Sequence, residues 1–290
     1  MRAAVLVDCT GDANVVELTG LAVHRNPELQ AATLVVRVSG YDADTLDYDG
    51  LQNAFEREVA DGRMKRTDPG WHRGRLDFFL KSYGGNRIHV AGVDARTSEG
   101  KTEAEIEARR AMLRLLRFCR RQPGLKDFTV DYCATECGIR ETVTIIGKKT
   151  ITIEDYAGGR LWEDAVCYSF YPVDVHRADH LDFREITAGV YPTIPLGAML
   201  PAGSHHIIAA GRCVSGDQEA NSAYRAQASC MAMGQAAGAA AALAAKLGAD
   251  FEDLSIADLH ALLRRHDAIV PGDIEQSAGP SDSGDAPRRT

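Results

Sequence analysis

The order of apolar and polar positions at the two ends of the chain predicts the parts of a nucleotide-type α/β fold. Residues 3–7 are apolar and are followed by a polar turn over 8–12, which is the pattern of a buried parallel strand that leads into a helix. A second strand is predicted over 206–210, and an Ala-rich helix over 226–247 follows it. We therefore expect the two ends of the chain to meet in one fold.

The middle of the chain, about residues 23–190, has the pattern of a separate α+β domain. Its apolar residues alternate or recur at helical spacing, which predicts strands over 33–38, 86–93, 128–132, 142–146, 150–153 and 168–175 and helices over 47–61 and 99–121. Between the first helix and the second strand, a Gly- and charge-rich stretch predicts a loop. We expect this segment to be inserted into the fold that the chain ends form.

The composition narrows the class of protein. A chain of 290 residues that is 45% hydrophobic and 26% charged is typical of a soluble globular protein with one large domain or two smaller ones. Its net charge of −8 gives no support for nucleic acid or an anionic membrane as a partner. The seven cysteines are an odd number in apolar surroundings, which indicates reduced thiols. We expect a soluble, cytoplasmic protein.

The longest uncharged stretch, residues 226–245, is about long enough to cross a bilayer, for which roughly 20 residues are needed. It consists mostly of Ala, Gly, Gln and Ser, and its glutamines would need partners in lipid. We therefore expect a buried helix of a soluble protein. The pair Gly234 and Gly238 then predicts close packing against a neighbouring element.

Two motifs carry the strongest information about function. Gly-Arg-Cys-Val-Ser at 211–215 is followed by Cys-Met-Ala-Met-Gly-Gln-Ala-Ala-Gly at 230–238. Both resemble the closing motifs of FAD-dependent oxidoreductases in the glutathione-reductase-like flavoprotein superfamily. Further stretches similar to the same branch occur in family order at 7–12, 138–142, 171–176 and 191–195. The resemblance implies oxidation or reduction of a small-molecule substrate by hydride transfer at N5 of a bound flavin.

The resemblance also implies a cofactor site at the chain ends. It places Thr10 and Gly11 beside the adenosine and pyrophosphate of FAD, Gly211 and Arg212 beside the ribityl-phosphate arm, and the start of the Ala-rich helix at the flavin ring. The full set that it implies is Thr10, Gly11, Gly211, Arg212, Cys213, Ser229, Cys230, Gly234 and Gln235. Glycine turns let backbone N–H groups approach an oxygen, and a helix N-terminus carries roughly half a positive charge, so both suit this cofactor.

One part of the family pattern does not occur in these residues. The superfamily begins with a strand and a Gly-x-Gly-x-x-Gly turn that supplies backbone donors to the diphosphate, and the 290 residues contain no such motif. A start assigned too late, a second chain that supplies this unit, and a degenerate fragment are three open explanations. We expect this chain alone to bind FAD weakly or not at all.

Two arginines are candidates for contact with an acidic substrate, and each has a structural alternative. Arg140 would clamp a carboxylate through two N–H groups or pair with a nearby glutamate. Arg225 precedes the Ala-rich helix, where it would stabilise an acidic substrate or a reduced flavin, or would pair with Asp217 or Glu219.

His176 is the candidate for proton transfer. It ends the Tyr-Pro-x-Asp-x-His motif and would donate to a substrate oxygen or move a proton, although a lone histidine is often structural. In an extended segment Asp174 would point to the same side and orient the ring of His176.

Cys133 and Cys137 are spaced so that an iron–sulfur site can be considered, but no second pair of cysteines at ligand spacing completes such a site. We predict isolated thiols and no metal.

Together these observations predict an α/β protein in which a partial FAD/NAD(P)-binding Rossmann-like fold carries an inserted α+β substrate-type domain. We expect residues 1–22 to be a remnant of the FAD-binding domain, 23–190 the inserted domain, 191–270 the C-terminal part of the FAD-binding domain and 271–290 a disordered tail. The predicted function is that of an FAD-dependent oxidoreductase. The alternative is a non-catalytic or split-subunit fragment that completes a flavin site only with another chain.

Overall fold

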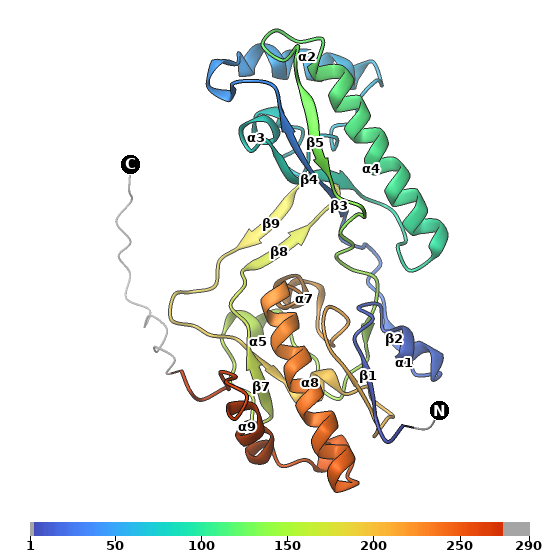
Figure 1. Ribbon diagram of the computed structural model, residues 1–290, viewed down its shortest axis with the longest axis vertical. Coiled ribbons are helices and arrows are strands. Elements are labelled where there is room, and N and C mark those ends of the chain that lie inside the picture. Colours follow the sequence, from blue (N-terminus) through green and yellow to red (C-terminus); the bar gives the residue numbers. More distant parts are fainter. Residues whose placement is uncertain (1–2, 275–290) are drawn as a thin grey trace. The chain divides into compact units, whose positions relative to one another are not determined.

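The computed structural model describes residues 3–274, which form two compact units. The described parts of unit 1 are residues 3–24, 144–173 and 184–274, and unit 2 consists of 25–143 and 174–183. Both units mix helices and strands, which confirms the α/β class (Figure 1). Most of the tail expected after residue 270 lies outside the described residues.

Unit 1 is built from pairs of short strands. The parallel pair that the chain ends predict is present, and two antiparallel pairs accompany it: β1 (Leu6–Asp8) with β11 (Ile207–Ala209), β7 (Ala165–Tyr168) with β10 (Thr193–Pro195), and β2 (Val23–His24) with β6 (Thr144–Ile145). Residues 144–173, which we expected in the inserted domain, belong to unit 1 because their two strands pair with strands of this unit.

The helices of unit 1 are mostly short, apart from α8 (Gln227–Leu247). The others are α1 (Asn14–Leu18), α5 (Ile153–Ala157), α6 (Leu196–Met199), α7 (Gln218–Tyr224), α9 (Ile256–Arg264) and the 3-10 turn η2 (Phe251–Asp253). The strand expected over 150–153 is wrong. Thr152 accepts from the N–H of Asp155, whose carboxylate accepts from the N–H of Thr152 in turn, so this capping box starts α5 there instead.

The helix α8 buries only one face. Its buried positions recur at helical spacing and pack into the core of unit 1: Ser229, Met233, Ala236, Ala237, Ala240 and Ala244. On the other side, a Cβ added to Gly234 or Gly238 would meet no atom of the described residues within 4 Å. The close packing predicted for this glycine pair is therefore wrong within residues 3–274, because their side of the helix is uncovered.

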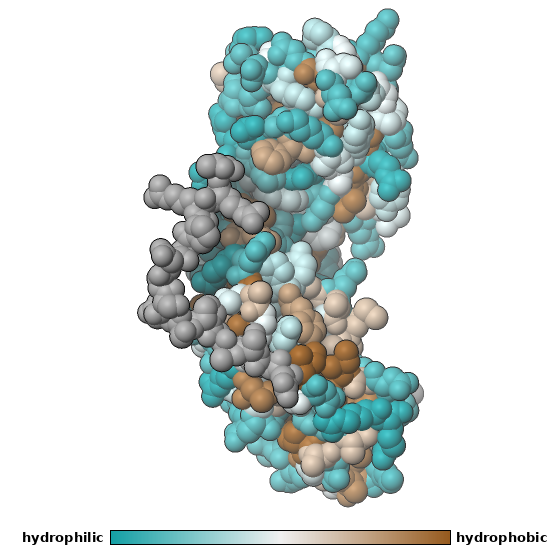
Figure 2. Space-filling view, turned by 90° about the vertical axis from the view of Figure 1, so that its left-hand side faces the viewer, coloured by the Kyte–Doolittle hydropathy of each residue, from teal (hydrophilic) through white to brown (hydrophobic). Residues whose placement is uncertain are grey.

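The helix α8 is apolar in composition, but only part of it is buried in the structure. By length and apolarity the helix could cross a membrane, and 33% of the stretch that passes this test is buried in the structure. A core helix of a soluble protein passes the same test. Apolar residues also gather elsewhere on the surface of unit 1, in the view of Figure 2, and Met231 on α8 is 75% exposed.

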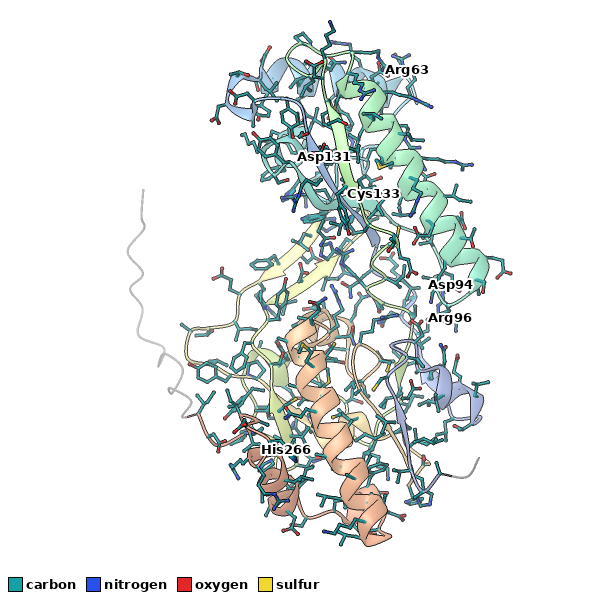
Figure 3. The ribbon with its side chains drawn as sticks, viewed as in Figure 1. Arg63, Asp94, Arg96, Asp131, Cys133 and His266 are labelled. Atoms are coloured by element: carbon teal, nitrogen blue, oxygen red, sulfur yellow. The ribbon has the colours of Figure 1, made fainter. Side chains whose placement is uncertain are left out.

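Unit 2 is a three-stranded antiparallel sheet with helices packed against its apolar face. The central strand β3 (Ala32–Ser39) pairs with β4 (Gly84–Val90) and β5 (Thr129–Cys133), as the alternation predicts. The helices are α2 (Tyr48–Ala60), α3 (Leu76–Lys81) and α4 (Ser98–Cys119), with the 3-10 turn η1 (Ala43–Thr45). Figure 3 shows Asp131 and Cys133 on β5, beside α4.

Two segments of unit 2 differ from the sequence-based expectation. The stretch predicted as a loop contains α3, because Leu76, Phe79 and Leu80 bury one helical face in the core. The strand expected over 168–175 is broken into β7 in unit 1 and β8 (Val173–His176), which pairs with β9 (Leu181–Arg184).

Candidate functional site

The carboxyl ends of β1 and β11 bring several of the predicted cofactor residues together. Asp8 and Ala209 are register partners, so the turns that follow the two strands start side by side. A Cβ added to Gly11 would lie 2.6 Å from Nη1 of Arg212, and Nη2 of Arg212 donates to Oδ1 of Asp12 at 2.6 Å. Asp12 is not among the predicted cofactor residues. It lies in the same motif, residues 7–12, from which Thr10 and Gly11 are predicted.

An opening in the packing lies at the same strand ends. Gly211 has a φ of 99°, and a Cβ added there would meet no described atom within 4 Å. The buried Nε of Arg212 has no hydrogen-bond partner among the described residues. A buried N–H without an acceptor costs about 1–3 kcal/mol. The residues present therefore fit an oxygen-bearing part of a cofactor at this edge, where ligands of open α/β sheets bind.

The N-terminus of α1 is occupied by a side chain of the chain itself. Oδ2 of the buried Asp8 accepts from the N–H groups of Val15 and Val16 at 3.0 and 3.1 Å. Its Oδ1 accepts from the N–H and the hydroxyl of Thr10 at 3.0 and 2.7 Å. The first N–H groups of α1 are thus used internally, and this helix does not offer them to a phosphate.

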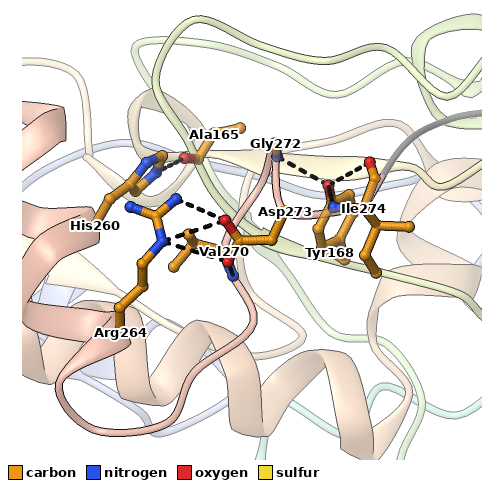
Figure 4. A network of polar contacts seen from close by, with 8 residues as sticks. All are labelled: Ala165, Tyr168, His260, Arg264, Val270, Gly272, Asp273 and Ile274. Atoms are coloured by element: carbon orange, nitrogen blue, oxygen red, sulfur yellow. Dashed lines mark hydrogen bonds and ion pairs between the residues drawn. The ribbon is translucent and has the colours of Figure 1, made fainter.

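Four of the predicted cofactor residues lie on α8: Ser229, Cys230, Gly234 and Gln235. Ser229 and Gln235 both line a cavity of about 290 Å³, at the lower end of the size of small-molecule sites. Tyr168 lines it as well, and its hydroxyl accepts from the N–H of Gly272 at 2.9 Å, which ties the C-terminal segment to β7 (Figure 4). The first turn of α8 has no acidic residue and no capping side chain, so its N-terminus is open to negative charge.

The thiols near these residues serve packing. Burial raises the pKa of Cys213 and of Cys167 to about 12, and it also raises the pKa of Cys230. Sγ of Cys230 donates to the carbonyl oxygen of Arg225 at 3.2 Å. None of the seven cysteines, all of which lie in the described part, is bridged. Residues 3–274 contain no group of three or more His, Cys, Asp or Glu side chains that could hold a metal ion.

A cluster of histidines forms the second part of the candidate site, within unit 2. His176 on β8 is 2% exposed, and its Nε2 lies 3.1 Å from Oδ2 of Asp174, as the two-residue spacing predicts. Its Nδ1 lies 3.0 Å from Nε2 of His89 on β4. The ring centroid of Trp71 is 4.9 Å from that of His176 and 5.1 Å from that of His89.

His89 and Trp71 are absent from the sequence-based prediction. The alternation of β4 holds a signal for the first, because the neighbours Ile88 and Val90 face the core and so direct His89 to the opposite face of the sheet. Trp71 lies in a Gly-rich loop with no periodicity, and nothing in its local sequence places it against a strand 18 residues away.

Arg140 is buried in the same unit and is 7% exposed. Its Nη1 donates to the carbonyl oxygen of Ala31 at 2.7 Å and to the hydroxyl of Thr33, and its Nη2 donates to Oδ1 of Asn86 at 3.4 Å. These contacts join three segments of unit 2. Arg140 is also close enough to His89 to lower its pKa.

Arg225 lies at the C-terminal end of α7 in unit 1. The two acidic residues considered as its partners have other contacts. Oδ1 of Asp217 caps α7 by accepting from the N–H of Ala220 at 2.8 Å. Oε2 of Glu219 lies 3.7 Å from Nη2 of Arg184. Of the three residues predicted at the substrate, the structure therefore places Arg140 and His176 in unit 2 and Arg225 in unit 1.

The chain matches a known protein family over most of its length. A model of the FAD-dependent oxidoreductases matches residues 1–263, and the chain belongs to this family. Membership implies a general flavin oxidoreductase function with FAD as the cofactor. No curated protein matches the chain, and no solved structure does.

Proposed function

We propose that this chain forms the ring and ribityl side of a FAD site and carries the groups that handle the substrate of an FAD-dependent oxidoreductase. In this proposal unit 1 is part of a Rossmann-like FAD-binding fold. The observation that carries it is the set of polar groups at the ends of β1 and β11, where Arg212 has a buried N–H without a partner next to an open Gly211. When bound, FAD supplies a two-electron acceptor at N5.

The residues of unit 1 hold the cofactor in this proposal. Arg212, fixed by Asp12, donates toward the ribityl-phosphate arm, and Gly211 leaves room for the backbone to approach it. The uncapped N-terminus of α8 favours negative charge on the flavin ring. Arg225, just before α8, adds a positive charge at the same end.

The residues of unit 2 handle the substrate proton. Loss of a hydride from a carbon that carries a hydroxyl or amine requires a base for the remaining proton. The buried carboxylate–imidazole contact between Asp174 and His176 stabilises such a proton and holds the ring in one orientation. Arg140, anchored on Ala31 and Thr33, keeps a positive charge beside this cluster, where an anionic substrate would be attracted.

The cofactor part of the proposal is tested by substitutions at two glycines. Gly211→Ala is expected to weaken FAD binding at least 10-fold, because the methyl group enters the opening beside Arg212. Gly248→Ala is the matched control, since Gly248 also has a positive φ, of 63°, and open space around an added Cβ. Both variants carry the same kind of backbone strain. Titration with FAD, followed by flavin fluorescence, measures the difference, and equal affinities would contradict the assignment.

A second candidate is a split-subunit or non-catalytic role, favoured by apolar surface on unit 1. Leu6 and Val7 of β1 are 42% and 39% exposed, and the Gly234 side of α8 is uncovered among the described residues. A second chain that carries a Gly-x-Gly-x-x-Gly strand–turn–helix unit would cover both. This candidate predicts a stable complex with such a chain and no turnover without it, whereas a flavin-loaded monomer would exclude it.

A further inference from the structure

Within residues 3–274, Nδ1 of His89 in the buried imidazole pair of unit 2 has no hydrogen-bond partner. Both nitrogens of His176 are in contact, Nε2 with Asp174 and Nδ1 with His89. His89 is 3% exposed, and its Nδ1 has no hydrogen-bond partner among the described residues. In this arrangement the ring nitrogen with a vacant position for a further proton is Nδ1 of His89.

The positions of the ring protons follow from the partners. An ionised Asp174 only accepts, so Nε2 of His176 carries a proton and donates it. Neutral His176 then has a lone pair at Nδ1, and His89 must donate to it from Nε2. One proton is already on Nε2 of neutral His89, so its Nδ1 carries a lone pair in a site removed from water.

A positive charge on His89 itself is strongly disfavoured. Burial, the nearby guanidinium of Arg140, and the rings of His176 and His72 lower the pKa of His89 to about 2. The guanidinium of Arg87, two residues away on the same strand, lies 4.8 Å from the ring centroid of Trp71. Asp174 is the acidic group in contact with the pair, and it contacts the His176 end.

We propose that His89 is the residue that exchanges a proton with the substrate, as the outer member of an Asp174–His176–His89 relay. Nδ1 of His89 takes the substrate proton while the proton on its Nε2 passes to Nδ1 of His176. The products are a neutral His89 protonated at Nδ1 and a His176 imidazolium paired with the Asp174 carboxylate. One proton enters and none leaves, and the reverse sequence returns it. This assignment rests on the proposed function and makes His176 an intermediate carrier.

The tautomers are measurable in the protein without flavin, by NMR of ring nitrogens in the ¹⁵N-histidine-labelled chain. At neutral pH we expect both rings to be protonated at Nε2 and bare at Nδ1. On acidification, His176 should become protonated at both nitrogens while His89 moves its single proton from Nε2 to Nδ1. Signals are assigned with His89→Gln and His176→Gln, and His206→Gln, at an exposed histidine of unit 1, is the control. A His89 that is protonated at Nδ1 at neutral pH, or that becomes a cation before His176 does, would overturn the relay.

Asp174→Asn separates a relay from a merely structural hydrogen bond. Loss of the carboxylate should lower the proton affinity of His176 by about 10- to 1000-fold, since an adjacent opposite charge shifts a pKa by about 1–3 units. The tautomer exchange of His89 should move to lower pH by the same factor. If His89 titrates unchanged in this variant, the two rings are not coupled and the proposal fails. Because flavin plays no part in this measurement, its failure is separable from failure of the oxidoreductase assignment.

Discussion

Replacing His176 with glutamine in the flavin-loaded protein is expected to lower kcat by about 10²- to 10⁴-fold, the usual contribution of a positioned acid or base. Glutamine keeps hydrogen-bonding groups near Asp174 and His89 but cannot hold the transferred proton. The rate of flavin reduction by substrate, followed by absorbance in a stopped-flow instrument, measures the step directly. Binding of substrate should change less than kcat, because the lost interaction develops with the proton.

His206→Gln provides the control for this prediction. The side chain of His206 is 65% exposed, lies in unit 1 and takes no part in the His176–His89 contact. We expect the kcat of this control variant to stay within about threefold of the parent value. Flavin content and unfolding midpoint are compared for both variants, so that loss of fold is not mistaken for loss of proton transfer. A His176→Gln enzyme with the parent rate would exclude this histidine from the reaction.

Asp8→Ala is expected to lower the free energy of unfolding by about 3 kcal/mol or more. The substitution leaves three backbone N–H groups without their acceptor, those of Thr10, Val15 and Val16. Each buried donor left unpaired costs about 1–3 kcal/mol, although such costs do not add fully. It also removes the carboxylate that caps α1. Urea unfolding followed by circular dichroism gives the difference.

Asp47→Ala is the comparison for this variant. Asp47 also accepts from a backbone N–H at a helix start, that of Gly50 at 3.0 Å, but in an exposed position. A single exposed cap is worth about 1 kcal/mol, so Asp8→Ala should be clearly more destabilising. Equal losses for the two variants would show that the buried network at the end of β1 does not stabilise unit 1 as proposed.

The sequence predicts the elements with strong local patterns and misses those that depend on distant partners. The apolar periodicity of α4, the long uncharged Ala-rich run of α8 and the alternation of β3 fix their type without tertiary information. The segment over 150–153 also alternates, yet the capping box at Thr152 converts it into a helix start. The sequence does not predict helix α3, because its short apolar face is surrounded by glycines and charges and is stabilised by the core of unit 2.

The contacts of the candidate site also fall into two groups, those that local sequence predicts and those that depend on distant residues. Contacts within a motif follow from spacing, as for Asp174 with His176. Contacts between motifs were not predictable: Arg212 and Asp12 are 200 residues apart, and His89 and His176 are 87 apart. These pairs depend on strand pairing, which hydrophobic patterns do not specify. The uncovered side of Gly234 shows the converse case, where a familiar motif predicts a contact that the described residues do not make.

The most direct test of the central claim is a FAD titration of the purified 290-residue chain, alone and with an added strand–turn–helix segment that carries Gly-x-Gly-x-x-Gly. We expect weak binding by the chain alone, and at least about 100-fold tighter binding with the segment, which corresponds to about 2.8 kcal/mol. The Gly211→Ala variant should lose most of that affinity in both preparations. A chain that holds near-stoichiometric FAD by itself, or one that binds none even with the segment, would contradict the account.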